Sequence, residues 1–442
     1  MGVDDRAVGL EAERPAVEER DGEAGLDDGL ALSLSAAMGS VAGLLGWVVS
    51  TRLIAPSEIG KAAEVVAAIL MIGGVAQLNL SVGMLRWIPA AGRFTSRLTW
   101  AGMLTVIPIG AVAALVFAIV LPSIAATTAG GLPWWVGAVL FVAATAGWTV
   151  FVAHDTLLVA MGKPWWAVWR NGLFGVVRLG MMIVLGLVGL GAQGIVVSWV
   201  LPIVVWIVVG SLVLAAMTRA VSRRARDGVL PGWRPAAAFL GPTSVAELGP
   251  ALLYNVVTVI VTERFGSATG ALFFMAWQAV TVVDVSATFF MKSLIVGVAR
   301  EPGRTAQLAA ATRRRLLVIF LPLLALGCLL AGPALGLVFG PEYAAAADVL
   351  RLLLVGLAFR LIVLIELGIR QALGRALAYA RLQLISTVLV VLVAAVVPVG
   401  ESTINGLVPV AVGYIAVQVV CAAAVLWAPA RRRPTDVEVL SP

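Results

Sequence analysis

Apolar runs of about twenty residues, separated by short polar connections, follow one another along nearly the whole chain. A hydrocarbon core about 30 Å thick needs roughly 20 consecutive apolar residues to be crossed by one helix. The pattern therefore predicts an all-α membrane protein with about twelve transmembrane helices. They are expected near residues 30–52, 62–84, 98–121, 133–157, 166–190, 194–217, 236–262, 270–292, 316–338, 346–368, 379–398 and 406–428.

Arginine and lysine gather in every second connection between these runs. The basic connections carry Arg86, Arg93, Arg97, Lys163, Arg170, Arg219, Arg223, Arg224, Arg226, Arg234, Lys292, Arg300, Arg304, Arg313, Arg314, Arg315, Arg370, Arg375 and Arg381. The other connections are nearly free of basic residues, and 122–132 and 399–405 have none. Because cytoplasmic loops retain lysine and arginine, the pattern predicts a multi-pass protein of the inner (plasma) membrane with both termini in the cytoplasm.

Charge also divides the chain into parts. Residues 1–29 hold ten acidic side chains and three arginines without an apolar run, which predicts a disordered cytoplasmic tail. A basic cytoplasmic linker at 218–235 separates an N-terminal six-helix bundle, 30–217, from a C-terminal six-helix bundle, 236–430, and a cytoplasmic tail follows at 431–442. Since six is even, both bundles have the same orientation, a plan common in secondary transporters.

Two neighbouring predicted helices carry polar stripes that do not suit contact with lipid. On the seventh helix the stripe is Glu247, Tyr254, Asn255, Thr258 and Thr262, and on the eighth it is Gln278, Thr281, Asp284, Thr288 and Lys292. Ionisable groups inside a membrane are expensive and tend to face a cavity or one another. The stripes therefore predict a shared cavity wall. For the milder pair Gln77 and Ser81 on the second helix, bonding across packed helices is the favoured interpretation.

Several other charged residues fall within the predicted spans. Asp155 and Arg178, on neighbouring helices, are expected to form an ion pair. Glu366 and Arg370 are four residues apart, the spacing of a local pair on one helix. Arg360 has no evident partner in the sequence, which leaves open a place facing the cavity.

Composition limits the function classes. Hydrophobic residues make up 61% of the chain and charged residues 12%, with mean hydropathy +1.02, whereas soluble domains carry about 25% charged residues. His154, Cys328 and Cys421 form no metal-binding pattern, and the nucleotide-binding pattern GxxxxGK followed by serine or threonine is absent. The short predicted outer loops leave no room for catalytic groups. These features predict a transporter rather than an enzyme, with no cofactor, no metal and no nucleic-acid partner.

Three short motifs resemble those of a known family. They are Arg52-Leu53-Ile54-Ala55-Pro56-Ser57-Glu58-Ile59-Gly60, then Leu80-Ser81-Val82-Gly83 with Arg86 and Pro89, and Phe339-Gly340-Pro341-Glu342-Tyr343. On these motifs the chain resembles the polysaccharide transporters, the lipid-linked oligosaccharide flippases of the multidrug/oligosaccharidyl-lipid/polysaccharide exporter (MOP) superfamily. Two positions depart from the family pattern: Ile59 replaces an aromatic residue, and Asn79 stands where these proteins often have glycine.

The resemblance implies a V-shaped, MATE-like pair of six-helix bundles around a central cavity that alternates between the two faces. It implies that a polyprenyl-diphosphate-linked oligosaccharide is turned over from the cytoplasmic to the outer leaflet for cell-surface polysaccharide biosynthesis. A coupling proton or sodium ion, membrane lipids, a polysaccharide polymerase and glycosyltransferases are the partners expected with it. The alternatives are a cation-coupled multidrug exporter of the same superfamily and a non-transporting subunit of a wall-assembly complex.

The candidate substrate-binding residues combine the polar stripes with basic residues near the ends of the cavity helices. They are Arg52, Glu247, Asn255, Arg264, Gln278, Asp284 and Lys292. A diphosphate favours arginine and lysine, and Glu247 or Asp284 is a candidate for binding the coupling ion. Arg86 also lies near a mouth of the expected cavity. For Arg86 and Lys292 the alternative is simple anchoring as cytoplasmic basic residues.

Overall fold

The computed structural model describes residues 38–300, 302–399 and 404–427, and nearly all of them are helical. The first helix is described from residue 38 to residue 53. The rest of the N-terminal half consists of α2 (Pro56–Ala76), α3 (Leu80–Ala91), η1 (Gly92–Phe94), α4 (Thr95–Val120), α5 (Pro122–Ala129), α6 (Trp134–Ala160), α7 (Pro164–Leu187) and α8 (Gly191–Arg224). The predicted tails, 1–29 and 431–442, lie outside the described residues.

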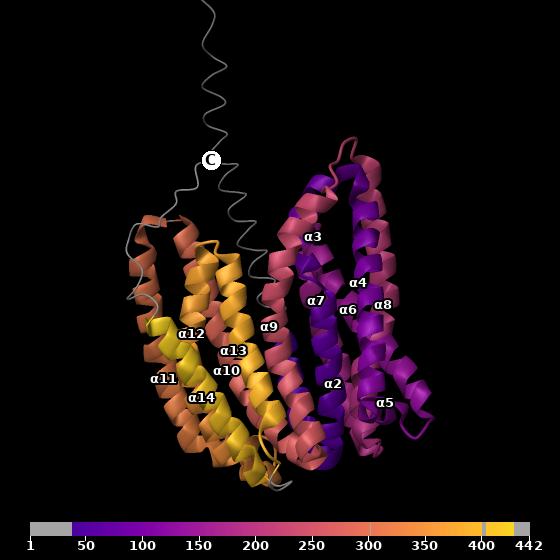
Figure 1. Ribbon diagram of the computed structural model, residues 1–442. Coiled ribbons are helices and arrows are strands. Elements are labelled where there is room, and N and C mark those ends of the chain that lie inside the picture. Colours follow the sequence, from indigo (N-terminus) through magenta and orange to yellow (C-terminus); the bar gives the residue numbers. More distant parts are fainter. Residues whose placement is uncertain (1–37, 301, 400–403, 428–442) are drawn as a thin grey trace, which may run out of the picture.

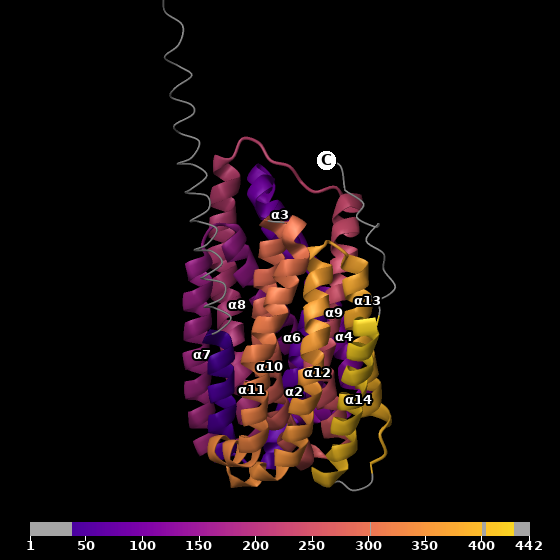
Figure 2. The same cartoon turned by 90° about the vertical axis from the view of Figure 1, so that its left-hand side faces the viewer.

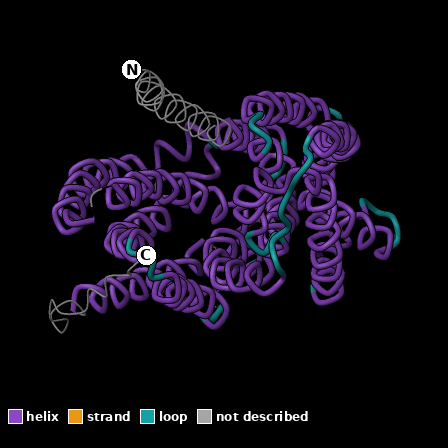
Figure 3. Tube along the Cα trace, turned by 90° about the horizontal axis from the view of Figure 1, so that it is seen from above, coloured by secondary structure: helices purple, strands orange, loops and turns teal. Residues whose placement is uncertain are grey.

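The C-terminal half repeats this helical plan. It consists of α9 (Trp233–Phe265), α10 (Ser267–Arg300), η2 (Pro302–Arg304), α11 (Thr305–Val338), η3 (Pro341–Ala346), α12 (Ala347–Ala372), α13 (Ala376–Val396), η4 (Ile404–Leu407) and α14 (Val408–Trp427). Figure 1 shows α2 to α8 in one bundle and α9 to α14 in the other, apart at one end and together at the other. Seen from above, the two bundles lie side by side (Figure 3). The predicted V-shaped pair of helical bundles is therefore confirmed.

The two ends of the molecule differ in charge. The connection between α8 and α9 and the turn between α10 and α11 lie where the bundles are apart (Figures 1 and 2), and they carry Arg226 and Arg304. Arg93 lies there too, because its backbone N–H donates to the carbonyl oxygen of Asp227 at 3.1 Å. We call this the basic end. The bundles come together at the other end, which we call the opposite end. The short connection between α9 and α10 lies there, and α5 lies at the same end on the outer side of the N-terminal bundle.

Ten of the predicted spans correspond to helical segments long and apolar enough to cross a membrane, counted within the described residues. The chain is therefore a multi-pass membrane protein. Of the other two predicted spans, the first falls partly outside the described residues. The seventh corresponds to α9, which is 33 residues long but is not among those ten.

The second predicted span, 62–84, is not one continuous helix. α2 ends at Ala76, and Leu78 and Asn79 have φ values of 45° and 50° before α3 begins. Asparagine tolerates this left-handed conformation better than most residues, because its short polar side chain can bond locally. The side chain of Gln77 donates to the carbonyl oxygen of Thr149 at 2.8 Å and accepts from Ser81 at 2.9 Å. These two stripe residues therefore bond across and along packed helices.

The bundles meet through α2, which packs against both α9 and α10. Ile59, Ala62 and Ala63 of α2 are fully buried in one apolar cluster with Val261 and Phe265 of α9. Gly60 makes the closest approach: a Cβ built on it would lie 1.8 Å from the backbone oxygen of Ser267, the first residue of α10. Only glycine allows the two backbones to come this close. The opposite end of the molecule is therefore shut by direct backbone packing between the halves.

Candidate substrate cavity

A cavity of about 540 Å³ lies between the bundles. The first helix, α2, α6, α7, α8, α9 and α10 all contribute to its walls. Its larger side chains are aromatic: Trp47, Trp148, Phe151, Phe174, Trp199 and Phe274. Its polar side chains are Ser40, Asn171, Arg178, Asn255, Gln278, Thr281 and Ser286. Of the seven residues predicted for the site, Asn255 and Gln278 line this cavity.

Arg178 of α7 is the one charged side chain that lines this cavity among the described residues. The side chain is 3% exposed, and its guanidinium carbon lies 4.4 Å from the ring centroid of Trp199 and 5.4 Å from that of Phe174. Within the described part of the chain, no carboxylate pairs with it and its Nε has no hydrogen-bond partner. The cavity thus contains an unneutralised arginine held by aromatic rings.

The predicted ion pair between Asp155 and Arg178 is wrong. Asp155 pairs instead with Arg170 at 2.7 Å and accepts a hydrogen bond from Asn171 at 2.8 Å. The reason is the geometry of a helical hairpin. Asp155 and Arg170 lie at similar distances from the turn that joins α6 to α7, whereas Arg178 lies two turns further along α7. Counting residues from that turn would have selected Arg170 and left Arg178 free for the cavity.

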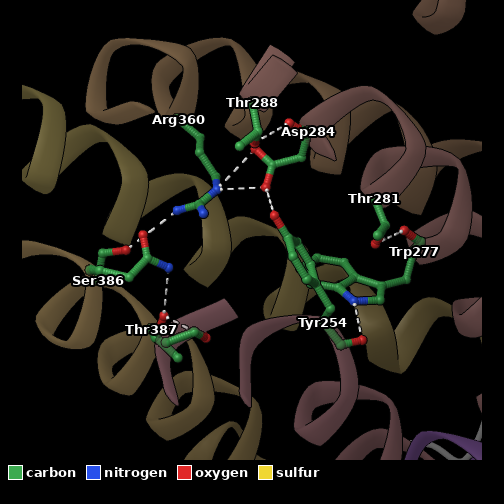
Figure 4. Close-up of polar contacts among 10 residues, drawn as sticks. Tyr254, Trp277, Thr281, Asp284, Thr288, Arg360, Ser386 and Thr387 are labelled. Carbon is green, nitrogen blue, oxygen red and sulfur yellow. Dashed lines mark hydrogen bonds and ion pairs between the residues drawn. The ribbon is translucent and has the colours of Figure 1, made fainter. Parts of the chain in front are cut away.

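Asp284 lies inside the C-terminal bundle, away from the central cavity, and is 2% exposed. Both of its carboxylate oxygens accept from Nε of Arg360 at 3.1 Å, and Oδ2 also accepts from the hydroxyl of Tyr254 at 2.6 Å (Figure 4). Arg360 reaches Ser386 at 3.5 Å on its other side. Arg360, which lacked an evident partner in the sequence, is thus the buried counter-charge of Asp284, joining α10 to α12.

Glu247 lines a second cavity, of about 290 Å³, within the C-terminal bundle. Tyr254, Arg360, Tyr379 and Gln383 line it as well. The polar stripe of α9 therefore divides: Asn255 faces the cavity between the bundles, whereas Glu247 and Tyr254 face the one inside the C-terminal bundle.

Arg52 and Arg264 lie at the opposite end, where they bind the ends of other helices. Arg52 donates to the carbonyl oxygens of Leu337 and Val338 in the last turn of α11, the second of them at 3.4 Å. Arg264 donates to the carbonyl oxygen of Ala394 near the end of α13 at 2.8 Å. Carbonyl groups in a last helical turn lack intrahelical partners and attract cations. Neither arginine lines the central cavity.

The remaining basic candidates lie toward the basic end. Lys292 belongs to α10, but its side chain is outside the described residues. The guanidinium of Arg86 lies over the ring of Phe239, 4.9 Å from its centroid. Near the end of α12, Arg370 pairs with Glu366 at 2.8 Å, which confirms the predicted local pair.

Replacing Asp284 by asparagine is expected to lower the free energy of unfolding by about 3–5 kcal/mol, because Arg360 would remain buried without a counter-charge. Asp348→Asn is the matched control, since Asp348 pairs with Arg351 at 2.5 Å but is 80% exposed, and exposed pairs contribute only about 0–1 kcal/mol. Denaturant unfolding of the purified protein in detergent measures both. Equal losses in the two variants would contradict a stabilising role for the buried pair.

The amino-acid sequence matches no protein-family model and no curated protein. Solved structures are nonetheless similar. An inward-facing multidrug resistance MATE family transporter of the MOP superfamily aligns with TM-score 0.62 and 17% identity, over 91% of this chain and 98% of that chain. The chain has a MATE-like fold. An outward-facing structure of such a transporter gives TM-score 0.54 at 16% identity, over 91% and 94% of the two chains.

One further MATE-like neighbour bears on the cavity. It is a MOP superfamily transporter from Pyrococcus furiosus, described as having a binding pocket of reverse polarity that suggests a different function. It aligns with TM-score 0.51 and 16% identity, over 91% of this chain and 94% of that chain. The MATE-like fold is therefore found with pockets of different polarity. The residues of this chain, and not its fold, therefore determine the charge of its cavity.

Proposed function

We propose that this protein is a membrane transporter that moves a polyprenyl-diphosphate-linked oligosaccharide from the cytoplasmic to the outer leaflet by alternating access. The observation that carries the proposal is Arg178, the one charge on the described walls of the central cavity. Arginine binds phosphate oxygens with two parallel N–H groups, and its attraction for an anion strengthens in an aromatic, poorly hydrated site. The cavity therefore favours an anionic headgroup.

The size and lining of the cavity suit such a headgroup. Ligand pockets commonly measure about 300–1,000 Å³ and combine aromatic walls with a few polar groups that fix orientation. This cavity measures about 540 Å³ and has that character, with Asn171, Asn255 and Gln278 available to sugar hydroxyls. The polyprenyl chain would stay in the lipid while the headgroup occupies the cavity.

The arrangement of the bundles suits a state that loads from the cytoplasm. The bundles are apart at the basic end, and arginine-rich connections are typical of the cytoplasmic side. The higher similarity to an inward-facing MATE structure than to an outward-facing one agrees with this orientation. We therefore assign the basic end to the cytoplasm of a cell whose plasma membrane holds the protein. A polymerase and glycosyltransferases would act on the product and the precursor.

A cation-coupled multidrug exporter is the second candidate, because solved structures that share the fold are multidrug transporters. Such a protein needs a negative charge beside its cationic substrate. On the described cavity wall the charge has the opposite sign. A non-transporting subunit of a wall-assembly complex would have no need for an unneutralised arginine in a cavity of this size, because a buried charge without a partner destabilises a protein.

A strain that lacks this protein is expected to accumulate intact lipid-linked saccharide on the cytoplasmic leaflet and to make less surface polymer. A flippase moves its substrate without changing its chemistry, so its loss stops the pathway between synthesis and polymerisation. The trapped precursor should be shielded from a lectin added outside intact cells and exposed to it in lysed cells. Unchanged polymer combined with greater sensitivity to cationic dyes would instead support the multidrug exporter.

A further inference from the structure

A pocket of about 430 Å³ lies at the opposite end, on the boundary between the bundles. Its walls come from α2, α5 and α8 on one side and from α9 and α10 on the other. Two carboxyl groups face it, Glu64 of α2 and Glu263 of α9. They belong to different bundles, at the end where the bundles meet. None of the predicted site residues lines this pocket.

Glu64 is 3% exposed, and its Oε1 has no hydrogen-bond partner among the described residues. Glu263 of α9, which is exposed, lines the same pocket from the other bundle. Ser123 of α5 donates to Oε1 of Glu263. Two acidic groups from opposite bundles therefore face one pocket, and the serine hydroxyl donates to the one on α9.

The described cations beside Glu64 have other partners. Lys61, one turn earlier on α2, also lines the pocket, but its ammonium pairs with Glu58 at 2.6 Å. Arg264, next to Glu263, donates to the carbonyl oxygen of Ala394. The pocket residues from α5, α8 and α10 are Ser123, Ala126, Thr127, Gln193 and Ser267, all of them neutral.

Two ionised carboxylates repel one another at contact distance and have no proton to donate. Two carboxyl groups that share one proton attract, because the protonated group donates to the ionised one. Glu64 and Glu263 face one pocket from opposite bundles, so a proton bound there favours their close approach. Loss of that proton would place two negative charges face to face across the boundary between α2 and α9. Repulsion there would separate the bundles at the opposite end.

We propose that Glu64 and Glu263 form a proton-binding pair that holds the opposite end of the transporter shut, and that release of the proton opens this end. The inference rests on the proposed function in one respect only, that the two bundles separate at this end during alternating access. It assigns the proton as the ligand and the pocket as its route from the outer solution. The pair is thus distinct from the cavity that would hold the lipid-linked substrate.

Distances between spin labels across the opposite end test the proposal. Leu132→Cys and Glu342→Cys place labels at exposed positions in different bundles, in a background with Cys328→Ser and Cys421→Ala. In the otherwise unchanged protein, the population is expected to shift from a short to a long distance as the pH is raised from mildly acidic to mildly alkaline. Glu64→Gln and Glu263→Gln should each keep the short distance throughout, because each removes one of the two carboxylates that would repel one another.

Three results would overturn the proposal. They are a distance that does not respond to pH, glutamine variants that respond like the parent protein, and sodium ions restoring the short distance at fixed alkaline pH. Asp348→Asn, which changes an exposed carboxylate on α12, should leave the response unchanged. Glu263 is exposed, so its variant provides the test even if Glu64→Gln does not fold. Because no substrate is present, a wrong assignment of the substrate would leave these distances unaffected.

Discussion

Arg178→Ala is expected to weaken binding of a polyprenyl-diphosphate saccharide roughly tenfold to hundredfold. Hydrogen bonds to charged groups contribute about 1.5–3 kcal/mol, and each 1.4 kcal/mol is about tenfold in affinity. Arg178→Lys should lie between the parent and the alanine variant, because lysine keeps the charge and loses the fork that matches phosphate oxygens. Titration of the detergent-solubilised protein with the fluorescently labelled lipid measures all three.

The stability of a further, uncharged variant, Arg178→Gln, distinguishes a binding residue from a structural one. Arg178 has no paired carboxylate among the described residues, so its removal leaves no orphaned counter-charge. Arg178→Gln should therefore unfold at a denaturant concentration equal to or above that of the parent while binding more weakly. Arg351→Ala is the control for binding, because Arg351 pairs with Asp348 and does not line the cavity. Unchanged binding in Arg178→Ala would contradict the role assigned to this arginine.

Gly60→Ala is expected to stop transport and to hold the opposite end open. The new Cβ would lie 1.8 Å from the backbone oxygen of Ser267, a separation that neither backbone can accept. Overpacking typically costs about 1–3 kcal/mol, which is enough to move a two-state equilibrium roughly tenfold to hundredfold away from the shut state. The label pair at Leu132 and Glu342 should then report the long distance at every pH.

Gly74→Ala is the matched control for this substitution. Gly74 lies on the same helix and also faces the other bundle, but its added Cβ would lie 3.5 Å from the Cβ of Ala251, an ordinary contact. Turnover and the distance distribution of this variant should match those of the parent protein. If Gly60→Ala behaved in the same way, the backbone contact with Ser267 would have no part in closing the opposite end.

The sequence was sufficient to predict which segments of the chain leave water and enter the membrane. Apolar runs reveal which segments leave water, so ten spans and the helical class follow from the pattern alone. The division into two bundles followed from the basic linker at 218–235, and their V shape followed from the resemblance. The sequence was less informative within the spans, because hydropathy does not distinguish lipid from protein as the surroundings of a side chain. The break at Leu78 and Asn79 is an example, since a left-handed backbone conformation inside an apolar run does not change its hydropathy.

Partners between distant helices were the other difficulty. Glu366 and Arg370 could be paired from the sequence because one helix fixes their spacing. Asp284 and Arg360 are 76 residues apart, and only the packing of α10 against α12 brings them together. Arg178 was assigned to Asp155 because both lie on neighbouring helices, although the hairpin brings Arg170 there instead. Because Arg178 was expected to pair with Asp155, it was not predicted to line the cavity. The pair formed by Glu64 and Glu263 could not be predicted, because it depends on how the two bundles pack together.

Movement of a lipid-linked saccharide between leaflets by the purified protein tests the central claim most directly. The protein would be reconstituted into vesicles that carry a polyprenyl-diphosphate saccharide in both leaflets, and a hydrolase added outside would cleave the accessible fraction. We expect the protein to expose the inner-leaflet fraction to the hydrolase, Arg178→Ala to leave it largely protected, and a trapped cationic dye to stay inside. Release of the dye while the inner-leaflet saccharide remains protected would contradict the account.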